Sequence, residues 1–390
     1  MVNRKKIVLI LVEDQRKPVR CCLDGFMRFA RRFKWNVQLV EGDPNGNFPT
    51  IGGLLKVWQP IGAVVFASSP SPAIGEEHFG SVPVVYVDSV SASQKIGRHR
   101  VVCDSSAIGR MAAKDYLARQ FRDLAYVPYP NAYEWCRRRE EGFAETVAAG
   151  GGEYHRVGER RPGWSIGTAE WLELVGQGLQ DLPKPCALLA ANDFVAMQVI
   201  NLCHQLAISV PEDVAVMGVD NDEAIDFGSE PSITSIEPDF VRAGHAAAAM
   251  LERLIRVPGA SPDALDFSAR RIVRRGSTST FLRRDPRVRK AVAFIQCHAM
   301  DGIGVESVVR AMGCSRRLAE LRFRETLAHS ISDEIALARV AQAENLLRNT
   351  RHGIPMISDA CGFGSVDAFR RTFIRIKGVG PLEYRISTRA

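Results

Sequence analysis

Short apolar runs alternate with helical stretches over the first 275 residues of the chain, and this alternation constrains the fold more than any other feature. The expected strands, rich in β-branched and other apolar residues, lie at 6–12, 35–40, 62–67, 83–87, 101–103, 124–127, 154–157, 187–190 and 214–218. The helices expected between them include 20–32, 106–118, 134–148, 193–205 and 243–256. Strands that are separated by helices pair in parallel, so this pattern predicts doubly wound α/β sheets.

The length and the apolar pattern limit the class of protein. A chain of 390 residues is too long for one ordinary core, so two or three domains are expected. No apolar run reaches the roughly 18 residues that a membrane span needs, and the run at 7–12 lacks a cleavage site after it. We therefore expect a cytoplasmic protein without a membrane partner.

The nine cysteines are odd in number and scattered along the chain. Their spacing fits neither a disulfide framework nor a zinc site, and no sequence motif predicts a cofactor or a metal ion.

The positive charge of the chain is concentrated in its last quarter. Residues 283–390 contain 19 Lys and Arg against 11 Asp and Glu, a net charge of +8, whereas the preceding residues carry a net charge of −1. A basic segment after a near-neutral body is typical of a domain that binds a polyanion.

The basic segment contains the pattern of a helix-turn-helix unit twice. A helix expected from Asp285 to Met300 is followed by a short helix at 306–312, a glycine turn, and a basic helix at 316–324 that begins after Ser315. The second unit has a short helix at 354–361 and a helix at 366–375 that begins after Ser365. The two serines lie 50 residues apart. Short helix, turn and capped helix are the parts of a DNA-reading unit, so double-stranded DNA is the expected partner.

Between the two units, residues 332–347 contain neither Pro nor Gly and are rich in helix-forming residues. They predict one long helix that fixes the distance between the units. Two recognition helices on one rigid domain can enter successive major-groove segments, about 34 Å apart along the DNA.

This segment resembles the AraC/XylS-type regulators over residues 285–389. The residues that carry the resemblance are 359–363, 369–373 and 380–385. By position, the resemblance implies base contacts by Arg317, Glu320 and Leu321 in the first recognition helix and by Asp367, Ala368 and Arg371 in the second. The expected contacts with DNA phosphates are Arg316, Arg322, Arg370 and Arg375. For any one of these arginines, an ordinary solvated helix face is an open alternative.

The first recognition helix departs from the family pattern. The family usually has Leu four residues after the capping serine and a basic residue six after it, where this chain has Ala319 and Leu321. We expect Leu318 to fill the core position instead.

Polar residues stand where several expected strands of the α/β body end: residues 13–14, 68–69, 88, 192–193 and 220–222. Ligands bind beyond the carboxyl ends of parallel strands, and such groups suit a polyhydroxylated small molecule. Turn formation by Asp, Asn and Ser is the alternative for any single one of them.

The body resembles the effector-binding domain of LacI/GalR-type regulators, a two-lobed domain related to periplasmic sugar-binding proteins. The residues that carry the resemblance are 192–197, 210–220, 231–237 and 244, with a weaker likeness at 139–143 and 164. By position it implies that Arg139, Trp164, Asn192, Asp220 and Glu237 contact a ligand. Asp14, at the end of the first expected strand, is a further candidate. Trp164 would stack on a sugar face while the polar groups bond its hydroxyls.

The expected architecture is therefore a sensor domain at 1–275, a linker at 276–284 and an all-α DNA-binding domain at 285–390. The family's usual N-terminal helix-turn-helix is absent, because the first strand starts almost at Met1. The domain order resembles that of activators of the xylose-operon type, which implies a pentose or related sugar and a role in activation. We expect a homodimer, with RNA polymerase as a further partner, in which ligand shifts an equilibrium between two states of the sensor.

Two other functions compete with that of a sugar-responsive regulator. An enzyme would need a reactive constellation, but the chain has no dinucleotide-binding, phosphate-binding, zinc-protease or serine-hydrolase motif, and no catalytic residue is predicted. The second alternative keeps DNA binding and makes the α/β body an interaction or dimerisation module without a ligand. Calorimetry against a panel of sugars separates it from a sensor.

Overall fold

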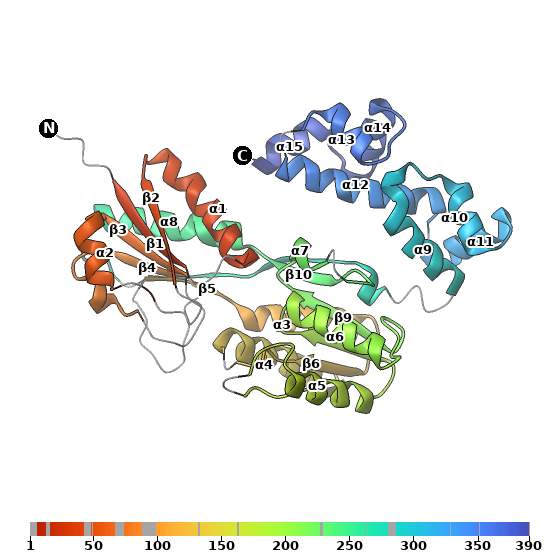
Figure 1. Ribbon diagram of the computed structural model, residues 1–390, viewed down its shortest axis with the longest axis horizontal. Helices are drawn as coiled ribbons and strands as arrows, with labels where there is room; N and C mark the ends of the chain where they lie inside the picture. The colour runs from red at the N-terminus through yellow and green to blue at the C-terminus, as the bar shows by residue number, and fades with distance from the viewer. Residues whose placement is uncertain are drawn as a thin grey trace. The chain divides into compact units, whose positions relative to one another are not determined.

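The computed structural model divides into two compact units, residues 1–278 and 279–390. It describes residues 6–12, 16–42, 48, 50–66, 74–87, 99–131, 133–161, 164–226, 229–261, 263–279, 286–327, 329–350 and 352–389. Figure 1 shows the helices and strands of each unit. In the described part of the chain, no helix is long and apolar enough to cross a membrane.

The first unit contains two six-stranded sheets. The strands of the first sheet are β1 (Ile7–Val12), β2 (Asn36–Glu41), β3 (Gly62–Phe66), β4 (Val84–Val87), β5 (His99–Cys103) and β11 (Asp263–Phe267). Those of the second are β6 (Asp123–Val127), β7 (Glu153–Arg156), β8 (Cys186–Ala190), β9 (Val214–Val219), β10 (Thr234–Pro238) and β12 (Ala269–Val273). We call these two halves the first and the second lobe.

Both sheets have the same winding. Their strand orders are β11-β5-β4-β3-β1-β2 and β12-β10-β9-β8-β6-β7, and every pair is parallel except β10 with β12. The order reverses between β1 and β3 and between β6 and β8. In doubly wound sheets, ligands bind beside such a reversal, outside the carboxyl ends of the strands.

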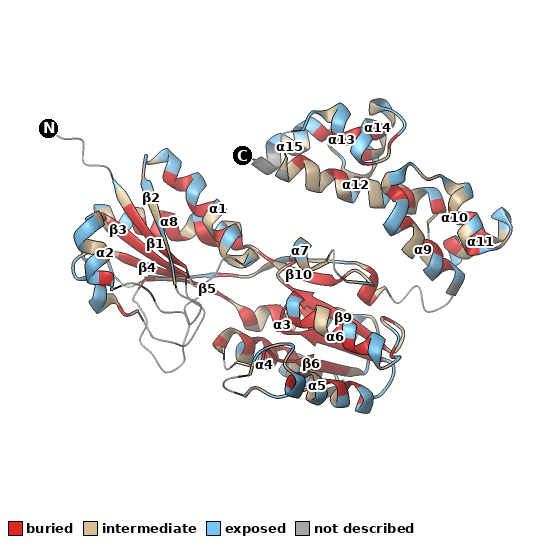
Figure 2. Cartoon of the chain, in the orientation of Figure 1, coloured by how far each residue is buried: buried red, intermediate tan, exposed pale blue. Residues whose placement is uncertain are grey.

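Helices cover the sheets, as the buried central strands require. They are α1 (Lys17–Arg32), α2 (Ile51–Trp58), α3 (Ser105–Ala118), α4 (Glu134–Ala149), α5 (Ala169–Asp181), α6 (Asp193–Gln205), α7 (Glu223–Asp226) and α8 (Phe240–Arg256), with the 3-10 turns η1 (Glu76–Phe79) and η2 (Gly276–Thr278). The central strands β3, β8 and β9 are buried along their whole length (Figure 2). Their continuous apolar runs are typical of parallel strands covered on both faces.

Two helix pairs pack unusually closely because glycines face a backbone. A Cβ at Gly109 of α3 would overlap the carbonyl of Arg139, and one at Gly142 of α4 would overlap that of Ser106. Gly25 and Gly244 make the same approach between α1 and α8. These contacts fix α4, which carries Arg139, and α1, whose first residue reaches the second lobe.

The segment expected to begin a linker is part of the first unit instead. Gly276, Ser277 and Thr278 are buried in η2. The Ser277 hydroxyl donates to the Val216 carbonyl at 2.6 Å and accepts from the Thr234 amide at 2.8 Å. The prediction of a linker at 276–284 is therefore wrong for these three residues, because they are buried in the first unit, where the Ser277 hydroxyl satisfies backbone groups of β9 and β10. Residues 280–284 lie outside the described part.

In the part of the second unit that the structure describes, all regular elements are helices. Its helices are α9 (Pro286–His298), η4 (Ala299–Asp301), α10 (Val305–Met312), α11 (Arg316–Leu327), α12 (Ile331–Asn349), α13 (Ile354–Ala360), α14 (Val366–Lys377) and α15 (Pro381–Arg389). The long helix predicted between two helix-turn-helix units is α12. Its first half joins a core around Phe323, and its second half joins a separate core around Phe369 and Phe373. The predicted fold class, parallel α/β sheets followed by an all-α region, is confirmed.

The start of α12 is fixed by a capping box and an ion pair. The Ser330 hydroxyl accepts from the Asp333 amide at 3.1 Å, and the Asp333 carboxylate accepts from the Ser330 amide at 3.4 Å. Arg375 of α14 donates to the same carboxylate at 2.7 Å. The hydrogen bond from the Ser330 side chain, followed by that from Arg375, lowers the pKa of Asp333 to about 2.

We predict that Asp333→Asn lowers the local free energy of unfolding of α12 at neutral pH by about 0.5–2 kcal/mol, the usual contribution of a helix cap. Because the folded pKa is depressed, this contribution is complete above the ordinary carboxyl value of 3.8 and is lost as the pH falls toward about 2. Hydrogen exchange of the α12 amides measures the difference. A difference between wild type and variant that is the same at pH 7 and pH 3 would contradict the assignment.

Candidate ligand site and candidate DNA interface

Asn192 and Asp220 follow two neighbouring parallel strands, β8 and β9. Asn192 is buried, and its side-chain oxygen accepts from the Val195 amide at 3.0 Å, so it also caps α6. Asp220 has a backbone φ of +106°, in the left-handed region that few non-glycine residues adopt. Strained residues of this kind concentrate at functional sites. The two residues thus stand where a doubly wound sheet binds its ligand.

Three successive amides hold the loop 220–222 in this conformation. The Asp220 amide donates to the Ile236 carbonyl at 2.9 Å, and the Asn221 amide donates to the Ser235 hydroxyl at 2.9 Å. The Asp222 amide donates to the Asp193 carboxylate at 2.7 Å. Sequence reasoning placed Asp193 at the strand end but did not assign it this support role. Burial, and then the nearby charge of Asp220, raises the pKa of Asp193 well above its ordinary value.

Arg139 is the one cation among the predicted ligand contacts, and it is buried, with 4% of its surface exposed. One terminal nitrogen donates to the Ala191 carbonyl, and the guanidinium carbon lies 4.9 Å from the centre of the Trp135 ring. Its Nε has no hydrogen-bond partner among the described residues. A buried charged donor without a partner is costly, so this arrangement suits a ligand that supplies an acceptor.

Two other predicted ligand contacts, Trp164 and Glu237, already have side-chain partners within the protein. Trp164 is half-buried, and the guanidinium carbon of Arg161 lies 4.8 Å from its ring centre. The Glu237 carboxylate already accepts from Arg271 at 2.8 Å and from Asn221 at 3.3 Å. Burial opposes ionisation of Glu237, but these hydrogen bonds outweigh it and lower its pKa. Asp14, like residues 68–69 and 88, lies outside the described residues.

Two side chains of the first lobe reach the second lobe beside this loop. Lys17, the first residue of α1, donates to the Asn221 carbonyl and pairs with Glu223 at 2.5 Å. Arg16 donates to the Tyr129 hydroxyl at 3.3 Å. Sequence reasoning missed both residues, because only the fold brings α1 to the end of β9.

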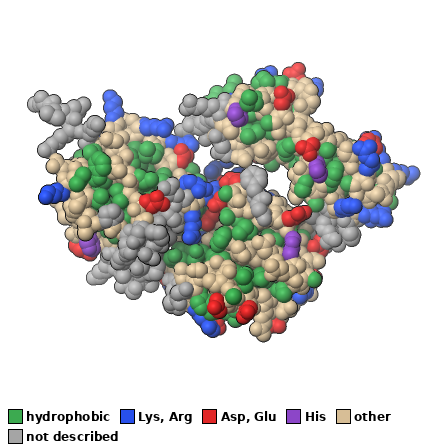
Figure 3. All heavy atoms as spheres, in the orientation of Figure 1, with side chains coloured by type: hydrophobic (Ala, Val, Ile, Leu, Met, Phe, Trp, Pro, Cys, Tyr) green, Lys and Arg blue, Asp and Glu red, His purple; other side chains and the backbone are tan. Residues whose placement is uncertain are grey.

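The two recognition helices of the second unit start in the same way. Ser315 accepts from the Leu318 amide at 3.3 Å before α11, and Ser365 accepts from the Ala368 amide at 3.1 Å before α14. Phe323 and Phe373, at matching places, are fully buried. Each helix therefore presents its opposite face outward. On the face drawn in Figure 3, Lys and Arg side chains gather over the end of this unit that contains α10 and α11.

The predicted DNA contacts differ in exposure. The exposed ones are Arg316, Arg317, Leu321, Asp367, Arg370, Arg371 and Arg375, and the half-buried ones are Glu320, Arg322 and Ala368. Two of the expected phosphate contacts already have ion-pair partners. Arg316 pairs with Glu306 at 2.7 Å and Arg375 with Asp333 at 2.7 Å. Their roles toward DNA remain predictions.

The expectation that Leu318 fills the core position of α11 is wrong. Ala319 is fully buried and lies one helical turn before Phe323, whereas Leu318 is only half-buried. Ala319 therefore occupies the core at the position where the family usually has the larger Leu.

Arg339 of α12 joins the two halves of the unit. It donates to the Ala299 carbonyl at 2.9 Å and the Ile303 carbonyl at 2.8 Å, and its guanidinium carbon lies 5.7 Å from the centre of the Phe363 ring. Burial lowers its pKa. Gly362, with φ +70°, lets the second turn approach closely, since a Cβ there would lie 2.7 Å from the carbonyl oxygen of Ala299. The sequence predicted a rigid spacing from α12. It did not predict the contacts of Arg339 and Gly362 that join the two halves, which we call the Arg339 clamp.

We predict that Arg371→Ala and Arg370→Ala, adjacent exposed arginines, weaken DNA binding in different ways. Arg371→Ala should cost about 1–3 kcal/mol on a duplex selected by the chain and relax the preference at one base pair, with little change on random DNA. Arg370→Ala should weaken all sequences alike and reduce the slope of log affinity against log salt by about 0.9. Fluorescence anisotropy over a salt series measures both. Uniform weakening by Arg371→Ala would reassign it to the backbone.

We also predict that Arg339→Met makes the spacing of the two helix-turn-helix units less strict. The change keeps the aliphatic length but leaves two carbonyls without their donor, which costs about 1–3 kcal/mol each where the carbonyl is buried. When the two half-sites of a selected duplex are moved apart by half a helical turn, the wild-type chain should lose DNA affinity. The variant should lose less affinity for the same duplex. The exposed Arg324→Met is the matched control. An equal loss of affinity in all three proteins would refute the Arg339 clamp.

The chain matches two family models. Residues 113–278 match a periplasmic binding protein-like domain, and residues 308–387 match a helix-turn-helix domain. Among curated proteins, it is 29% identical to the xylose operon regulatory protein of Escherichia coli K12 over 292 residues, which cover 74% of each chain. The xylose operon regulatory protein of Haemophilus influenzae is 27% identical over the same share.

Solved structures share the fold. A xylose-binding transcription activator matches with a TM-score of 0.66 at 24% identity and covers 99% of both chains. A cellobiose complex of a transcriptional regulator matches with a TM-score of 0.57 at 20% identity, over 71% of this chain and 86% of that one. With the two domains described above, these similarities identify the chain as a DNA-binding transcription regulator that resembles the xylose operon regulatory proteins, with a periplasmic binding protein-like domain ahead of a helix-turn-helix domain.

Proposed function

We propose that the chain is a cytoplasmic transcription activator whose DNA response is set by a pentose, xylose or a close relative, bound in the first unit. The observation that carries the proposal is the position of the buried Arg139 on α4, which donates to the carbonyl of Ala191, the residue before Asn192. Its Nε has no partner among the described residues, and Asn192 and Asp220 follow the neighbouring strands β8 and β9. A guanidinium, a carboxylate and an amide together offer donors and acceptors to adjacent hydroxyls. The similarity to xylose operon regulatory proteins supports xylose in particular.

In this proposal, Asp14, Trp164 and Glu237 complete the ligand site. Trp164 supplies a ring face for the sugar, and Glu237 acts chiefly through the hydrogen bonds that fix it to Arg271 and Asn221. Ligand that contacts both lobes favours their closed arrangement, to which Lys17 and Arg16 already contribute. The chain does no chemistry on the sugar.

The second unit reads DNA with α11 and α14. Arg317, Glu320 and Leu321 face bases in one major-groove segment, and Asp367, Ala368 and Arg371 face bases in the next. Arg370 and Arg322 contact phosphates, while Arg316 and Arg375 reach phosphates only by giving up the ion pairs with Glu306 and Asp333. A homodimer places two such units on one promoter, where activation also involves RNA polymerase.

The test is binding of D-xylose, other pentoses, hexoses and sugar acids to the full chain, by calorimetry. Asp220→Asn should lower the affinity for the bound sugar about 10- to 150-fold, because a hydrogen bond to a charged group contributes about 1.5–3 kcal/mol. Asn tolerates the left-handed backbone at this position, so the fold is kept. Sugar-free DNA binding should be unchanged, and excess sugar should restore the full response.

Asp181→Asn, at the exposed end of α5, is the matched control and should bind the sugar like wild type. If the chain binds DNA but none of these sugars, the first unit serves interaction or dimerisation and the sugar proposal fails. If Asp220→Asn binds sugar normally but responds differently on DNA, Asp220 belongs to the switch and not to the pocket.

A further inference from the structure

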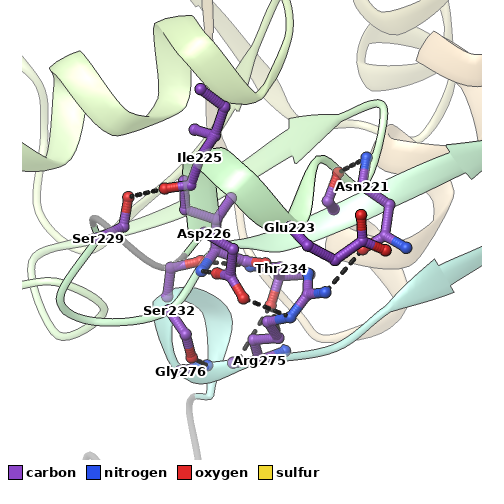
Figure 4. Close-up of polar contacts among 12 residues, drawn as sticks. Asn221, Glu223, Ile225, Asp226, Ser229, Ser232, Thr234, Arg275 and Gly276 are labelled. Atoms are coloured by element: carbon purple, nitrogen blue, oxygen red, sulfur yellow. Dashed lines mark hydrogen bonds and ion pairs between the residues drawn. The ribbon is translucent and has the colours of Figure 1, made fainter. Parts of the chain in front are cut away.

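Asn221, the residue after Asp220, uses almost every polar group it has. It is 5% exposed and has φ +50°. Its side-chain amide donates to Glu237 at 3.3 Å. Its side-chain oxygen accepts from Arg275 at 2.7 Å (Figure 4). Its main-chain carbonyl accepts from Lys17 of the first lobe. One residue thus links the proposed ligand loop, the other lobe and Arg275.

Arg275 is held through its side chain by the connection between β9 and β10. Besides Asn221, its guanidinium donates to the Ile233 carbonyl at 2.7 Å and pairs with Asp226 at 3.0 Å. Its main chain is fixed as well. The amide donates to the Thr234 hydroxyl at 2.8 Å, and the carbonyl accepts from the same hydroxyl at 3.1 Å (Figure 4).

Arg275 directly precedes the three residues with which the first unit ends. The Gly276 amide donates to the Ser232 hydroxyl at 3.3 Å, and the Ser277 amide donates to the Ser232 carbonyl at 2.9 Å. Thr278, the last residue of the unit, shares a 2.7 Å hydroxyl contact with Thr234. The segment 220–235 therefore holds the point at which the chain leaves for the DNA-binding unit.

The neighbouring Arg274 lacks this connection. Its guanidinium pairs with Asp115 on α3, and its side chain is half exposed. The two adjacent arginines that follow β12 thus contact different parts of the lobe. Arg275 is the one whose side chain contacts the loop that carries Asp220.

We propose that Arg275 is a positioning residue that couples occupation of the sugar site to the hold on Gly276–Thr278, and through it to DNA binding. The inference rests on the proposed sugar response. Asp220 and Asn221 are successive residues with left-handed backbone. A ligand that moves Asp220 therefore also moves the Asn221 side-chain oxygen, which accepts a hydrogen bond from Arg275. Closure of the lobes acts on the same residue, because Lys17 bonds the Asn221 carbonyl. Ligand shifts the equilibrium because these bonds differ between the two states.

Arg275→Lys tests the coupling. Lysine keeps the charge opposite Asp226 but lacks the fork that reaches Asn221 and Ile233 together. With the full chain, D-xylose and a selected duplex, we expect sugar to change the DNA affinity of wild type about 5- to 150-fold, and that of Arg275→Lys about threefold or less. Asn221→Gly, which keeps the left-handed backbone, should act alike, and the double variant should lose no more than either single one.

Two comparisons separate coupling from a merely structural role. Sugar-free DNA affinity of Arg275→Lys should match that of wild type, and calorimetry should still detect D-xylose binding. Arg274→Ala should keep the wild-type response within about twofold, because an exposed ion pair contributes little. A full wild-type response in Arg275→Lys would overturn the inference and leave the proposed sugar response intact.

A sugar-free measurement makes failure of the inference distinguishable from failure of the proposed function. Hydrogen exchange of the peptide that contains residues 276–279 should be at least about tenfold faster in Arg275→Lys and Asn221→Gly than in wild type, since a lost hydrogen bond to a charged group is worth that factor. Arg274→Ala should leave it unchanged. Unchanged exchange in the first two variants would overturn the hold of Arg275 on the exit, whatever ligand the chain binds.

Discussion

The parallel pairing of β8 with β9 is the constraint on which the first unit depends. Parallel strands end at the same edge of a sheet, so the residues after them meet without being near in sequence, as Asn192 and Asp220 do. Both strands are buried along their whole length, which makes the edge rigid. The left-handed backbone of Asp220 and Asn221 is unfavourable by itself and is offset by three successive amide hydrogen bonds to β10 and Asp193. The fold thus holds a strained loop beyond the carboxyl ends of β8 and β9, where doubly wound sheets generally bind ligands.

The second unit meets a different constraint, the small size of each half. Neither the three helices around Phe323 nor the three around Phe373 enclose much apolar surface, and small cores are marginally stable. Helix α12 contributes side chains to both, so the halves share one long element. Arg339 and the close approach at Gly362 then fix the angle between the two halves. A shared helix alone would let this angle vary.

The sequence predicted those parts of the fold that are coded locally. Central strands appear as apolar runs, and the capped helices of the second unit have serine and glycine at their ends, so both were predicted. Strands β11 and β12 were not, because edge strands of this kind keep charged and exposed residues that resemble a loop. Strand β10 is largely buried but was not predicted either, because its five residues include Thr, Ser and Glu. The buried turn at 276–278 was taken for a linker because it is small and polar, yet its hydroxyls are used inside the lobe. The strand-end pattern predicted Asp14, Asn192 and Asp220 as candidate ligand residues, and family resemblance added Arg139, Trp164 and Glu237. Asp193 was placed at a strand end without its support role, and the roles of Lys17, Arg275 and Arg339 were missed, because their partners lie far along the chain.

The rigidity of the second unit restricts how any ligand can act on it. Because α12 and Arg339 fix α11 relative to α14, a sugar bound in the first unit has no ready means of changing the spacing of the two recognition helices. What it can change is how firmly the first unit holds its last residues, since the loop after β9 bonds Asn221 to Arg275 and the segment up to Thr234 bonds Gly276–Thr278. Regulation of this kind changes where the DNA-binding unit is placed and leaves the unit itself unchanged. In the proposed mechanism, the DNA-binding unit stays rigid and the hold on the last residues of the first unit changes with ligand, and the contacts of the half-buried Arg339 and Arg275 supply these two parts.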